Sequence, residues 1–134
     1  MGEADGRPRM VAIDDEAEFT KTLQQFFGAR GYEVRIALTG PSGLALVESH
    51  TPDVVLVDLK LPGMDGDQLL QRIHRDHPAI RVIVITAYND GGKTRDRLLR
   101  AGAFAHFDKP IASLRELAET VKRAVTDRAK PAAG

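Results

Sequence analysis

Residues 54–63, VVLVDLKLPG, indicate the fold class of this chain. Its first four residues are apolar and mostly β-branched, which is typical of a strand that is covered on both faces, as strands of parallel sheets are. The run VIVI at 82–85 repeats the pattern. Asp58 directly follows the first run, and a lysine, a proline and a glycine continue as a loop. A carboxylate at the tip of a buried strand marks that end of the sheet as a candidate functional site.

The rest of the chain alternates between strand and helix patterns. We expect strands at 10–13, 32–37, 54–57, 82–85 and 103–107. Helical spacing of apolar residues lies between them, for example at 19–27 and 95–101, and a capping box at Ser113 and Glu116 opens the last helix. Strands separated by helices need right-handed crossovers, so the pattern predicts an α/β fold of the (βα)5 type: a doubly wound five-stranded parallel sheet with helices on both faces.

Composition limits the class of protein. A chain of 134 residues is long enough for one domain with a real core. Lys plus Arg and Asp plus Glu are equal at 19 each, so no net field indicates nucleic-acid binding. There is no cysteine, which excludes disulfides and thiolate metal sites, and no apolar run approaches the roughly 20 residues that span a bilayer. We therefore expect a cytoplasmic domain at 9–126 that binds neither membrane nor nucleic acid directly, with flexible tails at 1–8 and 127–134, the second a tail or a linker stub.

Polar residues follow the predicted strands at their carboxyl ends. They are Asp14 and Asp15 after the first strand, Asp58 after the third, Thr86 and Ala87 after the fourth, and Lys109 after the fifth. In a parallel sheet these ends meet at one edge, where ligands bind. Three carboxylates close together need a cation among them, either a hard divalent ion such as Mg²⁺ or Lys109. A carboxylate can also act as a nucleophile and form an aspartyl phosphate, with Thr86, the Ala87 amide and Lys109 as donors to the phosphoryl oxygens.

Four stretches carry a family resemblance: AIDDE (12–16), VVLVDLKLPGMDG (54–66), VIVITAY (82–88) and HFDKP (106–110). In order and spacing they closely resemble the receiver domain of two-component response regulators, of the chemotaxis-regulator-like kind. The resemblance covers about residues 9–126 and implies a flavodoxin-like sheet with strand order 2-1-3-4-5. It also implies that Asp58 accepts a phosphoryl group from a histidine kinase or a histidine phosphotransfer protein.

The same resemblance implies how the site is built. Mg²⁺ would be bound directly by Asp15 and Asp58 together with the backbone carbonyl of Lys60, while Asp14 would act mostly through water. Lys109 would bind a phosphate oxygen and would precede a cis peptide bond to the next residue, Pro110.

The resemblance further implies a switch. Thr86 would swing toward the phosphate and pull its loop with it, and the surface of the fourth helix, fifth strand and fifth helix would present the output to an output domain, a partner protein or a second copy of the chain. His106 stands where the family usually has Tyr or Phe, so that switching by a rotating aromatic ring is less assured here. Lys60 and Tyr88 occupy positions that influence phosphoryl lifetime in the family.

Three other interpretations remain open. Residues 87–94, AYNDGGKT, nearly match the phosphate-binding loop G-x-x-x-x-G-K-[ST], with Ala87 in place of the first glycine, which alone would suggest a nucleotide site. A phosphotransferase or phosphatase with an aspartyl intermediate is disfavoured because Lys60 stands where a second catalytic aspartate would be expected. A degenerate receiver that only binds partners is disfavoured because all the phosphorylation residues are present.

Overall fold

The computed structural model describes residues 6–87 and 90–129 of the chain. The elements in chain order are β1 (Arg9–Ile13), α1 (Ala17–Gly28), β2 (Glu33–Ala37), α2 (Gly40–His50), β3 (Val54–Val57), α3 (Gly66–Asp76), β4 (Arg81–Thr86), α4 (Lys93–Arg100), β5 (Ala105–Asp108) and α5 (Leu114–Ala129). All strand pairs are parallel, and the sheet order is β2-β1-β3-β4-β5. The predicted fold class and strand order are therefore confirmed.

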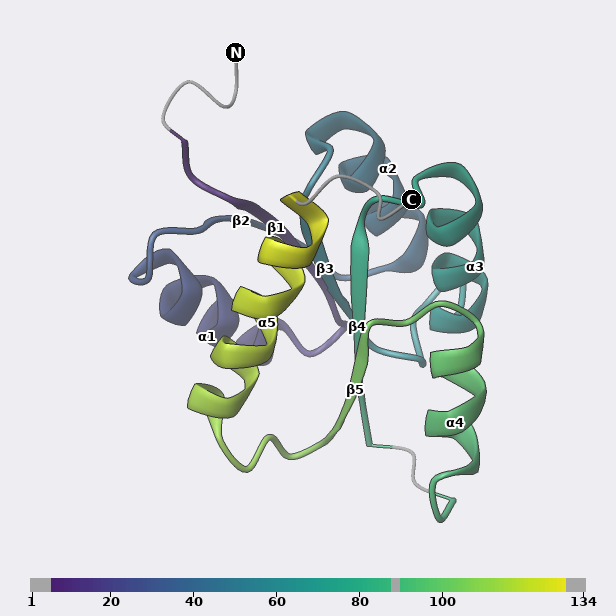
Figure 1. The fold of residues 1–134 in the computed structure, drawn as a ribbon. Helices are drawn as coiled ribbons and strands as arrows, with labels where there is room; N and C mark the ends of the chain where they lie inside the picture. The colour runs from purple at the N-terminus through teal and green to yellow at the C-terminus, as the bar shows by residue number, and fades with distance from the viewer. Residues whose placement is uncertain (1–5, 88–89, 130–134) are drawn as a thin grey trace.

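Alternating side chains divide the core into two layers, one on each face of the sheet. Helices α1 and α5 cover one face and α2, α3 and α4 cover the other (Figure 1). In β3, Val54 and Leu56 pack toward α1 and α5, whereas Val55 and Val57 pack toward the other three helices. All four side chains are buried, as expected for a central strand with helices on both faces.

Local capping explains several helix ends. The Thr39 hydroxyl accepts a hydrogen bond from the Ser42 amide at 3.1 Å and starts α2. The Asp65 carboxylate accepts one from the Gln68 amide at 3.0 Å and starts α3. The Ser113 hydroxyl accepts the Glu116 amide at 3.1 Å, which is one half of the predicted capping box.

Several strand boundaries differ by one residue from those expected, and larger differences occur at α4, β5 and α5. Helix α4 begins at Lys93 rather than at 95, because the Asp90 carboxylate accepts hydrogen bonds from the amide and the hydroxyl of Thr94 at 2.9 and 2.8 Å and so completes an earlier first turn. The ladder of β5 begins at Ala105 and not at 103. Helix α5 continues to Ala129, past the boundary expected at 126, and Asp127 in this last turn accepts a hydrogen bond from Arg81 Nε at 2.5 Å.

His50 is the last residue of α2 and is buried at the end of the sheet where the strands begin, opposite their carboxyl ends. Its carbonyl accepts a hydrogen bond from Arg9 Nη1 at 2.8 Å, and its Nε2 lies 3.8 Å from Glu33 Oε2 without a hydrogen-bond partner among the described residues. Burial lowers the pKa of His50 below its ordinary value, and the nearby charge of Arg35 acts in the same direction. No helix within residues 6–87 and 90–129 combines the length and the apolar character needed to cross a membrane.

Candidate functional site

The carboxyl ends of β1 and β3 bring three carboxylates together. Ile13 pairs with Val57 in the ladder, so the next residues of the two strands, Asp14 and Asp58, lie side by side. One oxygen from each of Asp14, Asp15 and Asp58 lies within 4.8 Å of the others. The side chains of Asp14 and Asp58 are 4% and 10% exposed, whereas Asp15 is exposed. The site therefore holds two buried carboxylates and one that faces solvent.

Lys109, from the end of β5, supplies the positive charge among these carboxylates. Its ammonium nitrogen donates to Asp14 Oδ2 at 2.6 Å, to Glu16 Oε1 at 2.8 Å and to Asp58 Oδ2 at 3.0 Å. It also lies 4.9 Å from the centre of the Phe19 ring, within the range of a cation–π contact. All three N–H groups of the ammonium thus have carboxylate partners, and the peptide bond that follows Lys109 is cis, as expected.

Burial and hydrogen bonding shift the pKa values of Asp14 and Lys109 in opposite directions. Burial raises the pKa of Asp14 above its ordinary value, although hydrogen bonds from Lys109 and from the Glu16 amide oppose this shift. Burial by itself lowers the pKa of Lys109, but the hydrogen bonds to Asp14, Glu16 and Asp58 outweigh it and hold the pKa above its ordinary value. Lys109 is therefore charged throughout the physiological range.

The backbone around Asp58 is packed tightly against the start of α3. The Asp58 amide donates to the Ile13 carbonyl at 3.0 Å, and Asp58 Oδ1 accepts the Lys60 amide at 3.3 Å. Gly66, the first residue of α3, donates its amide to the Leu59 carbonyl at 2.7 Å. A Cβ added at Gly66 would meet the Asp58 carbonyl oxygen and would lie 2.6 Å from Leu59 Cα. Only glycine allows the start of α3 to approach the backbone at Asp58 and Leu59 this closely.

The donor set suits a hard divalent cation. All three clustered groups are carboxylates, the ligand type that Mg²⁺ prefers. Both oxygens of Asp14 already accept protein hydrogen bonds, from the Glu16 amide at 2.9 Å and from Lys109. The carboxylate of Asp15 receives none within the described parts of the chain. Both oxygens of Asp58 also accept hydrogen bonds, from the Lys60 amide and from Lys109, so Asp15 is the member of the cluster whose carboxylate has no such contact among the described residues, and the donor set of the cluster fits the ion.

The predicted switch residues lie on the two strands beside the cluster. Thr86 is buried at the end of β4 and pairs with Asp108 in the ladder, and its carbonyl accepts the Lys109 amide at 2.9 Å. Ala87 is exposed. The side chain of His106 is only 7% exposed, and its Nε2 lies 3.8 Å from Asp108 Oδ1 with no hydrogen-bond partner in the described part of the structure. The imidazole of His106 is thus almost fully buried.

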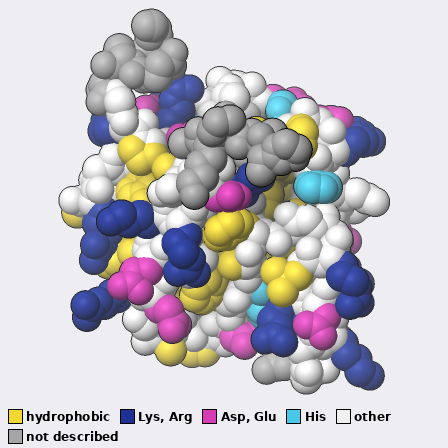
Figure 2. All heavy atoms as spheres, viewed as in Figure 1, with side chains coloured by type: hydrophobic (Ala, Val, Ile, Leu, Met, Phe, Trp, Pro, Cys, Tyr) yellow, Lys and Arg dark blue, Asp and Glu magenta, His cyan; other side chains and the backbone are white. Residues whose placement is uncertain are grey.

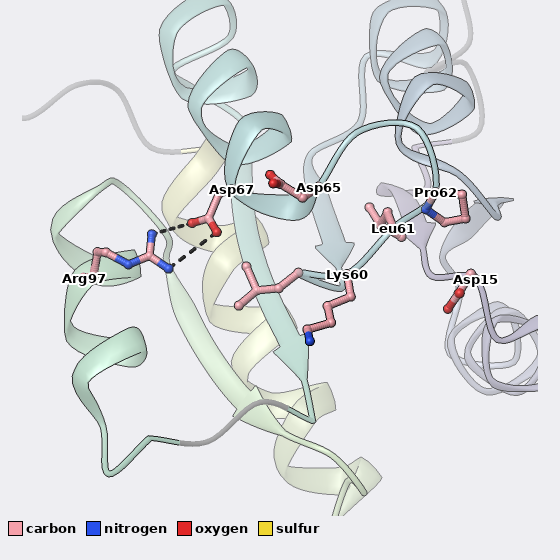
Figure 3. Close-up of a pocket in the computed structure, with 8 residues that line it drawn as sticks. Asp15, Lys60, Leu61, Pro62, Asp65, Asp67 and Arg97 are labelled. Atoms are coloured by element: carbon pink, nitrogen blue, oxygen red, sulfur yellow. Dashed lines mark hydrogen bonds and ion pairs between the residues drawn. The ribbon is translucent and has the colours of Figure 1, made fainter.

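A pocket of about 490 Å³ lies beside the loop that follows Asp58 and is lined by residues of that loop (Figure 3). The side chain of Lys60 stands in it between Asp15 and a pair of residues from α3 and α4. In that pair Arg97 donates to both oxygens of Asp67, at 2.5 and 3.4 Å. This bidentate ion pair connects the helix that follows Asp58 with the helix that follows Thr86.

The described part of the segment that resembles a phosphate-binding loop is bonded internally at the start of α4. Tyr88 and residue 89 lie outside the described residues. In the part that is described, Gly91 and Gly92 have φ angles of 76° and 95°, and the amide and hydroxyl of Thr94 are both bonded to Asp90. The Thr94 amide, which a phosphate group would need as a donor at this helix start, thus already donates to Asp90, and this disfavours the nucleotide interpretation.

The structure brings Asp14, Asp15, Asp58 and Lys109 into one cluster; their individual roles stay predictions. Sequence reasoning missed Glu16 as a partner of Lys109 and missed the pairing of Asp67 with Arg97. Glu16 had a visible signal, since it follows Asp15 at the same strand end. The Asp67–Arg97 pair had none, because the two residues are 30 positions apart on different helices.

Comparisons with known proteins agree with this geometry. The family model described as response regulator receiver domain matches residues 10–122. Sporulation initiation phosphotransferase F of Bacillus subtilis (strain 168) is 34% identical over 115 residues, which cover 86% of this chain and 91% of that protein. Regulatory protein AtoC of Escherichia coli (strain K12) is 36% identical over 117 residues, but they cover 87% of this chain and only 25% of that longer protein.

A solved structure supports the same assignment. The crystal structure of a CheY-like response regulator receiver domain protein from Methanospirillum hungatei JF-1 superposes with a TM-score of 0.84 at 33% sequence identity, covering 91% of this chain and 96% of that one. Family model, relatives and fold thus coincide over the segment that contains the acidic cluster and Lys109. The chain belongs to the receiver domain family of two-component response regulators.

Proposed function

We propose that this chain is a phosphorylation-controlled switch or relay in which Asp58 accepts a phosphoryl group from a phosphohistidine. One observation carries the proposal: Lys109 Nζ lies 3.0 Å from Asp58 Oδ2 in the middle of the acidic cluster. A carboxylate oxygen next to a fixed ammonium can attack phosphorus while the ammonium donates to the phosphoryl oxygens. The receiver domain is taken to span residues 9–126, with a tail at 1–8 and a tail or linker stub at 127–134 whose first residues continue helix α5.

The transfer forms one bond and breaks one. An oxygen of Asp58 donates its electron pair to phosphorus, and the bond between phosphorus and the imidazole nitrogen of the donor breaks, with the electron pair returning to nitrogen. Mg²⁺, when bound, supplies positive charge to the phosphoryl oxygens. We assign its direct ligands as Asp15, Asp58 and the backbone carbonyl of Lys60, with Asp14 acting through water. Lys109, the Thr86 hydroxyl and the Ala87 amide donate to the same oxygens.

Phosphorylation would then bias a two-state element. The new charge would form at the carboxyl end of β3, whose neighbour β4 ends at Thr86 before the segment that leads into α4, and β4 in turn pairs with β5, which contains His106. The face formed by α4, β5 and α5 carries basic and acidic side chains side by side with hydrophobic surface between them (Figure 2). Leu99 on α4 is 41% exposed, one of two large hydrophobic side chains so exposed in the described ranges. We assign this face as the output surface.

The partners follow from the family. We propose a histidine kinase or a histidine phosphotransfer protein as donor, and an output domain, a partner protein or a second copy of the chain as receiver of the signal. The relative named a phosphotransferase supports a relay, and the relative in which the chain matches only a quarter of the length supports an output domain. Cytoplasmic placement and the absence of direct nucleic-acid or membrane binding remain part of the proposal.

Phosphorylation can be tested with a small donor. The protein is incubated with acetyl phosphate and Mg²⁺, and its intact mass is measured. We expect a single phosphoryl adduct that hydroxylamine removes, absent in Asp58→Asn and present in the control Asp76→Asn, which alters an exposed aspartate far along α3. An adduct that survives in Asp58→Asn would refute the assignment. Steady hydrolysis of p-nitrophenyl phosphate would instead support the phosphatase alternative.

A further inference from the structure

Lys109 has one carboxylate partner that differs from the other two. The side chains of Asp14 and Asp58 are 4% and 10% exposed, whereas that of Glu16 is 62% exposed. All three accept hydrogen bonds of ordinary length from the same ammonium. Burying a carboxylate without a partner costs several kcal/mol, while an exposed one is hydrated when its partner leaves. The contact with Glu16 is therefore the cheapest of the three to break.

The backbone of Glu16 is bonded next to Lys109, and its side chain makes no competing contact with α1. It stands at the N-cap of α1, yet its side chain accepts no hydrogen bond from the first turn of the helix. Its carboxylate is directed to Lys109 instead, and its amide donates to Asp14 Oδ1 at 2.9 Å. Glu16 thus contacts both Lys109 and a second partner of Lys109 from a single position at the end of β1.

A phosphoryl group on Asp58 needs a hydrogen-bond donor, but in the unphosphorylated protein the ammonium of Lys109 already donates to carboxylates. The three N–H groups of Lys109 are matched to three carboxylates, so a phosphoryl oxygen gains one only when a carboxylate releases it. Building on the function proposed above, we propose that Glu16 is a positioning residue that competes with the incoming phosphoryl group for Lys109. Glu16 accepts one N–H of the ammonium in the resting protein and yields this hydrogen bond when the phosphodonor binds.

The competition acts on binding of the donor rather than on the chemical step. With acetyl phosphate, Asp58 oxygen forms a bond to phosphorus, and the bond from phosphorus to the acetate oxygen breaks with its electron pair on acetate. Asp14 and Asp58 continue to hold Lys109 when Glu16 is altered, so the ammonium stays at the site. Weakening the Glu16 contact should therefore lower the half-saturating concentration of acetyl phosphate and leave the maximal rate almost unchanged.

Three variants distinguish the effect of the Glu16–Lys109 hydrogen bond from the effect of the negative charge at position 16. Glu16→Gln removes the charge and weakens the contact. Glu16→Asp keeps the charge but is one methylene shorter, and its carboxylate is suited to cap α1 instead of reaching Lys109. Glu18→Gln, the control, removes an equal charge from an exposed residue in the same first turn of α1. Initial phosphorylation rates are measured by intact mass over a range of acetyl phosphate concentrations at fixed Mg²⁺.

We expect the half-saturating concentration to fall by about two- to fivefold in both Glu16 variants, the range that an exposed ion pair produces. The maximal rate should change less than about twofold, and Glu18→Gln should match the unaltered protein. A Glu16→Asp variant that behaves like the unaltered protein would show that only charge matters and would overturn the proposal, as would equal shifts in Glu16→Gln and Glu18→Gln. If the unaltered protein takes no phosphoryl group, the proposed function fails and this inference falls with it; if phosphorylation is normal and the Glu16 variants are silent, only the inference fails.

Discussion

Replacing Gly66 by alanine tests how the backbone holds Asp58 in place. Gly66 is the buried first residue of α3, and an added Cβ would overlap the Asp58 carbonyl oxygen and lie 2.6 Å from Leu59 Cα. Both contacts are backbone atoms of the segment that leaves β3, so neither can rotate away as a flexible side chain would. Either the start of α3 or the backbone that carries Asp58 must shift.

The size of the effect follows from two opposing contributions. Overpacking a tight site costs about 1–3 kcal/mol, and rigid backbone on the other side places Gly66→Ala toward the upper end. Alanine favours a helix over glycine by roughly 1 kcal/mol at most, which offsets part of the cost. We expect the free energy of unfolding to fall by about 2 kcal/mol. Because a displacement of about 1 Å can lower a rate by on the order of 100-fold, phosphorylation of Asp58 should slow at least about tenfold.

The assay is urea unfolding followed by far-ultraviolet circular dichroism, combined with the phosphorylation rate from acetyl phosphate. Gly28→Ala is the matched control, since Gly28 ends α1 with nothing within 4 Å of an added Cβ. That variant should be as stable as the unaltered protein or up to about 1 kcal/mol more stable. A Gly66→Ala protein within about 0.5 kcal/mol of the unaltered one, the usual range for surface substitutions, and phosphorylated at the same rate would refute the reasoning.

Three further predictions concern parts of the fold away from Asp58. Burial lowers the pKa of His50 below its unfolded value, so the neutral imidazole contributes stability above the unfolded pKa, and this contribution is lost as the pH falls through that value. The free energy of unfolding should therefore fall less between pH 7.5 and 5.5 in His50→Gln than in the unaltered protein. Equal changes of this free energy with pH in the two proteins would count against the prediction. Thr39→Ala removes the hydroxyl that caps α2 and should lower the free energy of unfolding by about 1 kcal/mol, whereas Thr39→Ser should retain most of it. Arg97→Gln breaks the pair with Asp67, whose side chains are 52% and 40% exposed, and should cost only about 0.5 kcal/mol in urea unfolding, so a loss above about 2 kcal/mol would show a larger structural role.

The sequence by itself determined the sheet and the edge at which the site lies. Uniform apolar runs at 54–57 and 82–85 require cover on both faces, and intervening helices require parallel strands, so Asp14, Asp58 and Lys109 had to meet at the carboxyl edge. This inference needs only the periodicity of apolar residues and the alternation of strands and helices along the chain, both of which are visible in the sequence. The family resemblance pointed to the same edge through residues spread over four separate motifs.

Only the tertiary structure decided which side chains touch at that edge and beyond it. Glu16 binds Lys109 across 93 positions and Arg97 binds Asp67 across 30, and neither pairing follows from spacing. The end of α5 illustrates the same limit: its polar last turn reads as a tail, yet Asp127 there is bonded to Arg81 at the start of β4. Such contacts depend on how distant elements pack and on which rotamers that packing leaves open, and a local pattern in the sequence contains neither.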